Sequence, residues 1–330
     1  MKNVMVIGGT SFIGSHLVEK LSQEGYKVRV LVRKQSDTNF IQGLKKIELC
    51  LGDILDLDSL KKALEGIDTV FCSVNVKPGG LNFRQYHNAL ERVHVEGVKN
   101  LIEACKCNKT KRFFYLSSMS ATLYEKNLYT LNEFSIRDLH NVYGRVKLEA
   151  ENLLRRVPEE ELGVTIFRPP EVFGERGPGA LARYILFIKN GVIPVLGSIK
   201  NTHNIAYVGN IADQIIFLSK QDSSKGKQYI ISDEKPYMES EIIETVCRSM
   251  NARPLKLRIP GWFLYCGIGI LRFFTRICLK KELMSMEESA LVINGHISSG
   301  FKILHELGYR QRYDLQAAVA RTINWYKIKK

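Results

Sequence analysis

The chain has 330 residues, of which 45% are hydrophobic and 25% charged, a balance typical of a globular protein with one large or two smaller domains. Its net charge of +14 suits an anionic ligand or a membrane surface, and no motif for binding nucleic acid accompanies it, so nucleic acid is not an expected partner. The seven cysteines lack the paired spacing of a zinc site, so we expect free thiols, a reducing cytoplasmic setting and no bound metal.

The sequence MKNVMVIGG opens with an apolar run that is too short for a signal peptide and leads directly into a glycine-rich turn. We interpret this run as the first strand of the fold. No stretch reaches the length of about 18 uncharged apolar residues that a membrane span requires, so no spanning helix is expected. Strands are predicted next, in chain order, at 4–8, 27–33, 46–53, 68–74, 111–118 and 163–169, with helices between them at 12–25 and 89–106.

These alternating elements predict a doubly wound, parallel α/β sheet, because near-continuous apolar runs are typical of strands covered on both faces. After Pro169 and Pro170 the alternation of strands and helices becomes less regular. Further strands are predicted at 202–208 and 227–232, and further helices at 209–220 and 238–250. We expect a sheet domain over 1–170, to which elements around 200–220 return. A smaller region over 171–330 should pack at the edge of the sheet where its strands end, which is where such sheets bind ligands.

The turn VIGGTSFIG, at 6–14, joins the first predicted strand to the first predicted helix. Gly8 permits a tight turn, Gly14 lets the helix pack closely on the strand, and the amides at the start of the helix can bind a pyrophosphate. This strand–turn–helix setting is the one that a dinucleotide site requires. The expected cofactor contacts here are Gly8, Thr10, Ser11, Phe12, Ile13 and Gly14.

The second predicted strand ends in Arg33 and Lys34. A carboxylate at this place would bind a ribose hydroxyl of NAD, whereas a cation suits the 2′-phosphate of NADP. NADP is therefore the expected cofactor, with NAD as the alternative. An ordinary solvated, basic strand end is the other interpretation.

Tyr143 and Lys147 stand one turn apart in a predicted helix, within YGRVKLEAE at 143–151. The same spacing recurs at Tyr326 and Lys330, so the spacing alone identifies nothing. With the glycine-rich turn and the serines of YLSSMSAT at 115–122, however, the sequence resembles the extended short-chain dehydrogenase/reductase superfamily, also called the NAD-dependent epimerase/dehydratase family. It is most similar in pattern to the 3β-hydroxysteroid dehydrogenase-like branch, and the resemblance covers nearly the whole chain.

The resemblance implies a Rossmann fold, an NAD(P)-dependent oxidoreductase and a catalytic set of three residues. Tyr143 would act as the acid or base, and Lys147 would lower the pKa of its phenol and hold the nicotinamide ribose. Ser118, 25 residues before Tyr143, would hold the substrate oxygen. Two residues depart from the family: Ser11 replaces the usual middle glycine, and His94 stands where an asparagine is expected near the active site.

The resemblance also implies contacts to the cofactor from three further segments. Asp53 and Ile54 would lie beside the adenine. The segment after the fourth strand and the segment FRPPEVFG, at 167–174, would line the rest of the cofactor through Ser73, Val74, Asn75, Pro169, Pro170 and Val172. Substrate contacts are expected from Ser120, Glu171, Arg176 and His203.

The segment THNIAYVGNIADQI, at 202–215, bears on the substrate. Enzymes of the family that act on nucleotide sugars often carry an arginine where this chain has His203, and neutral histidine is a weaker ligand for a diphosphate. AYVGNIA, at 206–212, is similar to the hydroxysteroid dehydrogenase branch. We therefore expect a steroid, terpenoid or similar lipid-like alcohol or ketone. Arg176 and Arg183 could supply the missing charge, so a nucleotide-sugar epimerase, dehydratase or reductase stays the alternative; a nonenzymatic cofactor-binding scaffold at a membrane is a lesser one.

A basic and apolar segment at 258–281 is the last informative feature. Residues 251–281 contain seven Lys or Arg and no acidic residue, and Arg272, Arg276 and Lys280 would form one stripe on a helix. Such a helix suits an anionic membrane interface, which predicts peripheral contact with the inner surface of the membrane. A helix that caps the substrate site, or a dimer contact, is the alternative. A homodimer is expected from the resemblance alone, and the final predicted helix, at 314–327, is expected to be structural.

Overall fold

Seven parallel strands form the main sheet, in the order β11-β6-β5-β4-β1-β2-β3. Their bounds are β1 Asn3–Ile7, β2 Lys27–Val32, β3 Ile47–Leu51, β4 Thr69–Cys72, β5 Arg112–Leu116, β6 Gly163–Arg168 and β11 Lys227–Ile230. The structure, a computed structural model, describes residues 3–76, 80–121, 142–177, 179–196, 202–259 and 307–328. The predicted doubly wound α/β sheet is confirmed.

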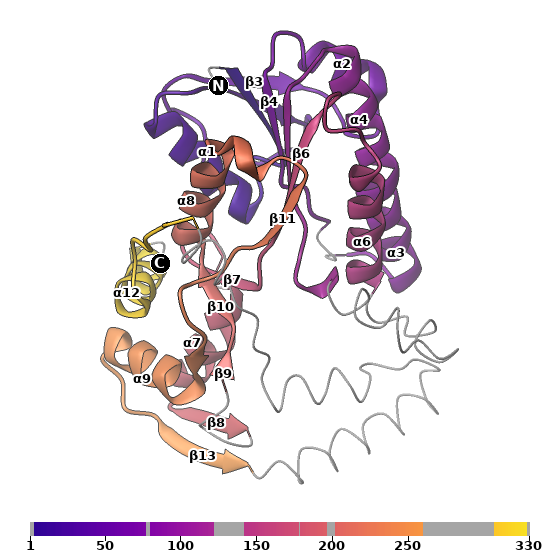
Figure 1. Ribbon diagram of the computed structural model, residues 1–330. Coiled ribbons are helices and arrows are strands. Elements are labelled where there is room, and N and C mark those ends of the chain that lie inside the picture. Colours follow the sequence, from indigo (N-terminus) through magenta and orange to yellow (C-terminus); the bar gives the residue numbers. More distant parts are fainter. Residues whose placement is uncertain are drawn as a thin grey trace. The chain divides into compact units, whose positions relative to one another are not determined.

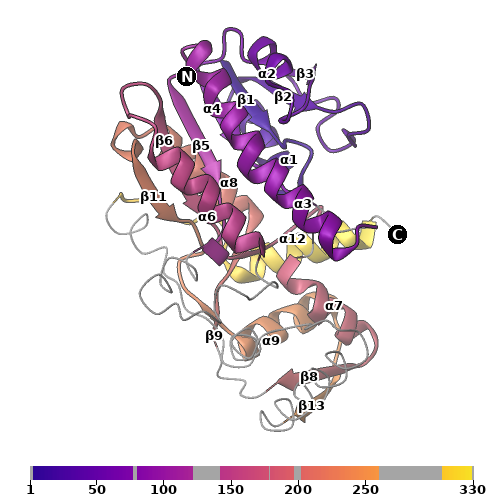
Figure 2. The ribbon, with the colours of Figure 1, turned by 90° about the vertical axis from the view of Figure 1, so that its right-hand side faces the viewer.

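Helices cover both faces of this sheet (Figures 1 and 2). On one face lie α1 and α8, and on the other lie α4 and α6. The bounds of the helices in this part are α1 Phe12–Gln23, α2 Leu57–Ala63, α3 Phe83–Glu91, α4 Gly97–Cys107, α6 Val142–Arg155 and α8 Val208–Ser219. Residues of β1, β4, β5 and β6 are nearly all buried, as apolar runs between two helical layers should be. β3 differs, because it is an edge strand whose Leu49 and Leu51 remain exposed.

The structure corrects two of the predicted elements and confirms a third. The helix expected over 89–106 begins earlier, at Phe83, and is interrupted by a π-helical turn at Arg92–Glu96. The strand expected over 202–208 is split into β9 Thr202–His203 and β10 Ile205–Tyr207, because the two pieces pair with different strands. The strand expected at 227–232 is β11, which joins the main sheet beside β6.

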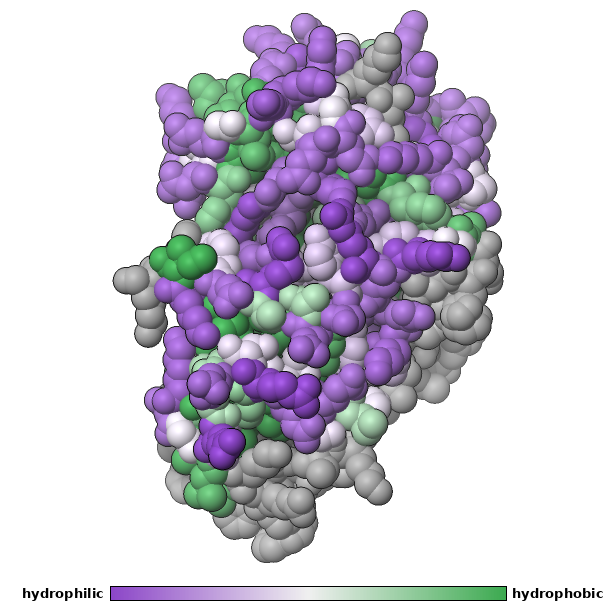
Figure 3. Space-filling view, turned by 90° about the vertical axis from the view of Figure 1, so that its left-hand side faces the viewer, coloured by the Kyte–Doolittle hydropathy of each residue, from purple (hydrophilic) through white to green (hydrophobic). Residues whose placement is uncertain are grey.

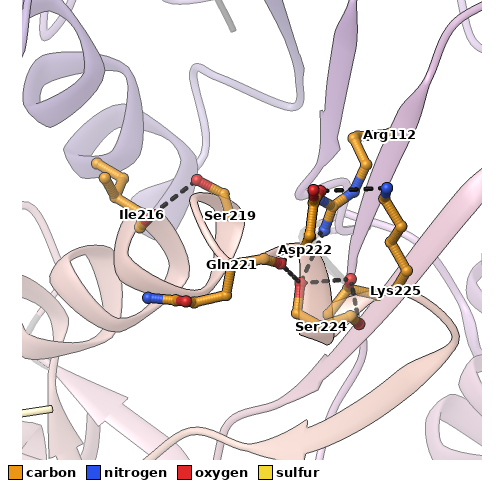
Figure 4. Close-up of polar contacts among 8 residues, drawn as sticks. Arg112, Ile216, Ser219, Gln221, Asp222, Ser224 and Lys225 are labelled. Atoms are coloured by element: carbon orange, nitrogen blue, oxygen red, sulfur yellow. Dashed lines mark hydrogen bonds and ion pairs between the residues drawn. The ribbon is translucent and has the colours of Figure 1, made fainter. Parts of the chain in front are cut away.

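A cluster of polar contacts fixes β11 and the turn before it to the main sheet (Figure 4). The guanidinium of Arg112, at the start of β5, donates to Ser224 Oγ at 2.7 Å and lies 3.4 Å from a carboxylate oxygen of Asp222. Thr165 in β6 donates to the carbonyl oxygen of Ser224 at 2.8 Å. Because the cluster lies where β5 and β6 begin, it stabilises the end of the sheet opposite to the strand ends that bear ligands in such folds.

The chain divides into two units. The first contains the main sheet and residues 211–231; the second contains 170–210 and 232–330. The second unit has three short strand pairs, of β7 Glu171–Phe173 with β10, β9 with β12 Tyr237–Met238, and β8 Val192–Leu196 with β13 Leu255–Ile259. Its helices are α7 Ala182–Lys189, α9 Glu239–Met250 and α12 Leu315–Ile328, the last close to the helix expected at 314–327.

The buried carboxylate of Asp233 organises part of the second unit. It accepts hydrogen bonds from Asn210 Nδ2 at 2.8 Å, from the Tyr237 hydroxyl at 3.1 Å and from the backbone amide of Tyr207. Three separate stretches of this unit, at 207–210, 233–237 and 313, are fixed together, since Asn210 also binds the backbone of Tyr313.

Within the described ranges, no helix is both long enough and apolar enough to cross a bilayer. The face shown in Figure 3 is mostly hydrophilic, with hydrophobic side chains in small, separate groups. The basic and apolar segment at 258–281 lies outside the described residues from position 260 onward.

Candidate active site

The candidate active site lies where the connections of the sheet change direction. Successive strands run outward from β1 through β2 to β3, and then from β4 through β5 and β6 to β11. Crevices at such a switch point, beyond the carboxyl ends of the strands, are the ligand sites of doubly wound sheets. The residues after β1, β4 and β5 are therefore the ones to consider first.

The turn after β1 is shaped by glycines that no other residue could replace without movement. Gly8 has φ +79°, and a Cβ placed on it would lie 2.5 Å from the carbonyl oxygen of Ser73. A Cβ on Gly14 would overlap the carbonyl oxygen of Gly8. The first turn of α1 therefore lies directly against β1 and the end of β4, which requires glycine at both positions.

Ser11 is the N-cap of α1, and this explains its presence in place of a glycine. Its Oγ accepts a hydrogen bond from the amide of Gly14 at 3.2 Å and donates to the carbonyl oxygen of Ser73 at 3.2 Å. The side chain thus stabilises the turn from within. The amides of Phe12 and Ile13 remain without partners inside the helix, as the first amides of any α-helix do.

These features fit a dinucleotide. The amides of Phe12 and Ile13 at the start of α1 are free of helical partners, and the helix dipole adds positive potential at this end. Beyond β2, Arg33 and Lys34 are exposed, and the carboxylate of Asp53 accepts from the amide of Leu55 at 3.0 Å within its own turn. No acidic side chain ends β2, as the sequence indicated.

Other predicted cofactor residues occupy the same end of the sheet. Ser73 and Ile54 are buried, Val74 is half-buried, and the side chain of Asn75 caps the next amide, of Val76, at 2.9 Å. Pro169 accepts from the amide of Met119 at 2.9 Å, which links the ends of β5 and β6. Pro170 and Val172 belong to the second unit.

Ser118, Tyr143 and Lys147 come together beyond β5. The Ser118 hydroxyl is hydrogen-bonded to the Tyr143 phenol, and it also accepts from the amide of Ser120 at 3.1 Å. Lys147 Nζ lies 5.7 Å from the centre of the Tyr143 ring and donates to the carbonyl oxygen of Leu116 at 2.8 Å. A hydroxyl, a phenol and an ammonium group thus converge from β5 and α6.

Burial dominates the protonation of this set. It raises the pKa of Tyr143 to about 12, with the hydrogen bond from Ser118 acting in the opposite direction. Burial also lowers the pKa of Lys147 to about 8. The sequence led us to expect that Lys147 would lower the pKa of Tyr143; in the structure the effect of burial is larger, and the pKa is raised.

A buried ionic network behind Lys147 was missed by the sequence analysis. Glu151, one turn after Lys147 and fully buried, accepts from Ser117 Oγ at 2.5 Å and from Arg168 Nε at 2.9 Å. Arg155 also donates to Glu151, at 2.8 Å. The only signal in the sequence was a glutamate on the same helical face as Tyr143 and Lys147, and its partners lie far away along the chain.

His94 lies on the π-helical turn and is fully buried. Its ring meets the ring of Tyr143 edge-on, with 6.0 Å between the ring centres. Burial first, and the charge of Lys147 second, hold the pKa of His94 well below its usual range, so the imidazole is neutral. The departure from the expected asparagine therefore places a neutral imidazole against the ring of Tyr143.

The predicted substrate residues are divided between the two units. Ser120 lies beside Ser118 in the first unit, with 3.3 Å between the hydroxyl oxygens. In the second unit, His203 Nε2 lies 3.8 Å from a carboxylate oxygen of Glu239. Glu171 is exposed in β7, and Arg176 adopts the left-handed backbone conformation with φ +71°.

Arg183 was a candidate for binding an anion, but its charge is already engaged. Its guanidinium stacks on the ring of Tyr184 at 4.8 Å and donates to the hydroxyl of that tyrosine at 2.9 Å. The carboxylates of Glu171 and Glu239 also act on it and help to raise its pKa. A diphosphate would have to compete with two acidic side chains for this cation.

Comparison with known proteins agrees with this arrangement. The sequence profile of the NAD dependent epimerase/dehydratase family matches residues 4–232. N-acetyl-alpha-D-glucosaminyl-diphospho-ditrans,octacis-undecaprenol 4-epimerase of Escherichia coli O157:H7 is 27% identical, over 98% of this chain and 95% of that protein. Human sterol-4-alpha-carboxylate 3-dehydrogenase, decarboxylating, is 28% identical over 79% of this chain and 70% of its own.

Solved structures share the fold. UDP-N-acetylglucosamine 4-epimerase from Methanobrevibacter ruminantium M1 superposes with a TM-score of 0.73 at 19% identity, covering 100% of this chain and 99% of that one. The match of the family profile extends over well more than half of the chain and includes the glycine-rich turn, Ser118, Tyr143 and Lys147. The chain therefore belongs to the NAD-dependent epimerase/dehydratase family of the extended short-chain dehydrogenases/reductases, a family of NAD-dependent dehydrogenases and epimerases.

Proposed function

We propose that the chain is an NAD(P)-dependent oxidoreductase that interconverts a secondary alcohol and a ketone on a lipid-like substrate. The observation that carries this proposal is the convergence of Ser118, Tyr143 and Lys147 at the same end of the sheet as the glycine-rich turn. A proton-transfer group next to a dinucleotide site is what the oxidation of an alcohol requires.

Each residue has a part in the proposed reaction. In the direction of oxidation, the Tyr143 phenolate takes the proton of the substrate hydroxyl while the carbinol carbon gives up a hydride. Ser118 donates a hydrogen bond to the same substrate oxygen, and Lys147 holds positive charge near the phenolate. The bound nicotinamide supplies the hydride acceptor and, when oxidised, a further positive charge. Reduction reverses these roles, and Tyr143 then gives its proton to the carbonyl oxygen.

Burial makes the charge near Tyr143 essential to this proposal. With its pKa raised to about 12, the phenol by itself would be almost wholly protonated at neutral pH. A positive charge that reaches the phenol oxygen favours the phenolate most strongly in such a dry site, since the interaction is weakly screened there. We infer that the Lys147 ammonium turns toward the phenol oxygen in the working enzyme.

Two observations support a lipid-like substrate. Relatives whose names include sterol and undecaprenol align with 79% and 98% of this chain, respectively. In addition, Arg183, one of the two cations that could replace an arginine at the position of His203, is stacked on Tyr184 and compensated by carboxylates. Both fit a substrate whose recognition depends on apolar surface more than on a free diphosphate.

An epimerase is the second candidate. The undecaprenol-linked relative, which matches 98% of this chain, is named as an epimerase of a sugar joined to a polyprenol diphosphate. Such a substrate has both a lipid and a sugar hydroxyl. Oxidation of that hydroxyl, followed by return of the hydride to the opposite face of the ketone, would use the same Tyr143 and Ser118.

Replacement of Tyr143 tests the shared chemistry. Tyr143→Phe should abolish turnover and leave the affinity for the cofactor within a few-fold, because it removes one proton-transfer group and no contact to the pyrophosphate. Tyr326→Phe is the matched control: it has the same spacing to a lysine, lies in the second unit and should keep activity. Retained turnover in Tyr143→Phe would remove this residue from the proton-transfer role.

The substrate class is tested by adding candidate compounds to the wild-type protein with cofactor bound, and by measuring its melting temperature and turnover. A steroid or isoprenoid alcohol that raises the melting temperature and is oxidised would support the leading candidate. Change in configuration of a polyprenyl diphosphate sugar, with no net change in cofactor, would support the epimerase. Stabilisation by a soluble UDP-sugar alone would contradict a lipid-like substrate.

A further inference from the structure

The outer edge of β3 pairs with no other strand in the described part of the chain. β3 is the last strand of the main sheet, beyond β2 (Figure 2). Its sequence is IELCL, and Leu49 and Leu51 are 46% and 64% exposed. An unpaired edge strand presents a row of backbone N–H and C=O groups to any partner that can extend the sheet.

Three apolar residues of β3, namely Ile47, Leu49 and Leu51, form a stripe along one face of the strand, because side chains alternate between the faces. In the register of β2 with β3, Val30 lies beside Leu49 and points to the same face. Val30 is fully buried, close to Val18 of α1. The stripe therefore continues a buried apolar surface past the cover that α1 provides.

The opposite face of β3 already has its partners. Cys50 packs against the buried core to which α2 and α4 contribute, and a carboxylate oxygen of Glu48 lies 3.1 Å from Arg29 Nε in β2. The stripe itself carries no charge, and β3 contains neither a proline nor a bulge. These are the usual devices that keep edge strands from pairing, so this edge is open to a partner on the side of the stripe.

A second copy of this chain fits the stripe, because the sequence of the stripe is self-complementary. A two-fold axis perpendicular to the sheet pairs two edge strands antiparallel and passes through one residue of each. With the axis at Leu49, that residue lies opposite its own copy and Ile47 lies opposite Leu51, which gives three apolar pairs. An axis at Glu48 would bring two carboxylates together, and an axis at Cys50 would leave Ile47 without an apolar partner.

The charges that flank the strand agree with this arrangement. Lys45 and Lys46 precede β3 and are exposed, and the half-buried Asp53 follows it. Antiparallel pairing brings the basic start of each strand to the acidic end of the other. A parallel arrangement would instead place the lysines of the two copies side by side, where like charges repel.

We propose that two copies of this chain associate through their β3 strands, which pair antiparallel about a two-fold axis at Leu49. The two main sheets then form one continuous sheet, and the two stripes bury each other. The contact is smaller than a standard interface, so the association is weak and depends on concentration. This inference is independent of the proposed reaction, because no residue of the stripe has a part in that reaction.

Light scattering over a range of protein concentrations tests the association. The mass of the wild-type assembly should halve in Leu49→Lys, because two ammonium groups would lie opposite each other at the axis. The concentration at half-dissociation should rise by about a hundredfold or more. Leu186→Lys is the matched control, since it places the same charge at another exposed leucine, in α7, and it should leave the curve unchanged. Turnover per chain should be the same in all three proteins.

Disulfide formation tests the register. Residues opposite each other in antiparallel strands have Cα atoms about 4.5–5.5 Å apart, within the reach of a disulfide. Leu49→Cys should therefore cross-link to its own copy under mild oxidation. Leu51→Cys should not, because its two copies are offset by four residues, roughly 13 Å along the strands. A mixture of Leu51→Cys and Ile47→Cys should give the mixed product, and the masses of the linked peptides separate these products from those of the native cysteines.

Three results would overturn the inference. One is a wild type that stays a single chain at about 200 μM, a concentration at which weak interfaces form. Another is an unchanged mass in Leu49→Lys, which would place any contact between copies elsewhere. The third is cross-linking of Leu51→Cys to itself, or none of Leu49→Cys, which would exclude the axis at Leu49. If Leu49→Lys does not fold, the cross-linking of Leu49→Cys decides.

Discussion

At the scale of single residues, the candidate catalytic side chains were predictable where sequence motifs surrounded them. Tyr143 and Tyr326 have the same spacing to a lysine, and only the ordered motifs before Tyr143 separated the two. The pKa of Tyr143 was not predictable, because burial depends on packing that no short pattern describes. The structure also gives the adjacent serines different contacts: Ser118 is bonded to Tyr143 and Ser117 to Glu151.

Cofactor preference is a prediction at this scale. Arg33→Ala with Lys34→Ala should weaken binding of NADP by about tenfold or more, through loss of charge-assisted bonds to the 2′-phosphate, and leave binding of NAD nearly unchanged. Fluorescence titration with both reduced cofactors measures this. Lys62→Ala, at another exposed cation of the first unit, is the control and should change neither affinity. Equal losses for the two cofactors, or a wild type that prefers NAD, would contradict the NADP assignment.

At the scale of elements, the strands of the sheet were predictable because buried parallel strands are apolar runs of distinct length. The π-turn at Arg92–Glu96 was not, since no pattern in the sequence marks the place where the helical hydrogen bonds change. The contacts that fix α6 to the sheet could not be predicted from the sequence either. Ser117 and Arg168, which hold Glu151, come from the ends of β5 and β6, and no periodicity in the sequence connects them.

The buried ion pair yields a prediction for α6. Glu151→Gln should destabilise the protein by about 3–5 kcal/mol in the free energy of unfolding, because it leaves Arg168 buried without a counter-charge. Glu151→Leu combined with Arg168→Met removes both charges and should recover a large part of that loss. Denaturant unfolding gives these values.

The exposed pair Arg92–Glu96 is the matched control for this experiment. Its side chains are 62% and 61% exposed, so Glu96→Gln should change the free energy of unfolding by no more than about 0.5 kcal/mol. If Glu151→Leu with Arg168→Met were as unstable as Glu151→Gln, the buried Glu151–Arg168 pair would act through its shape and hydrogen bonds and not through charge balance.

At the scale of the whole molecule, the fold class and the family followed from the alternation of elements and the ordered motifs along the chain, and both are confirmed. What the sequence could not give is how the second unit is held together. Asp233 connects Tyr207, Asn210 and Tyr237 by contacts between short, unpatterned stretches. Short strands with different partners, such as β9 and β10, leave no periodic signal.

The net charge of +14 leads to a last prediction, on membrane contact. If the basic residues of 258–281 lie in an anionic interface, Arg272→Glu, Arg276→Glu and Lys280→Glu together should abolish sedimentation with phosphatidylglycerol vesicles, which is already weak on phosphatidylcholine. The matched control is Lys45→Glu, Lys62→Glu and Lys109→Glu, three exposed cations of the first unit whose reversal changes the net charge by the same amount. Binding that survives in the control and is lost in the first set would place the contact in this segment. Equal loss in both would mean that the vesicles sense net charge only, through a field that salt screens over about 10 Å, and the proposal of a local membrane contact would fail.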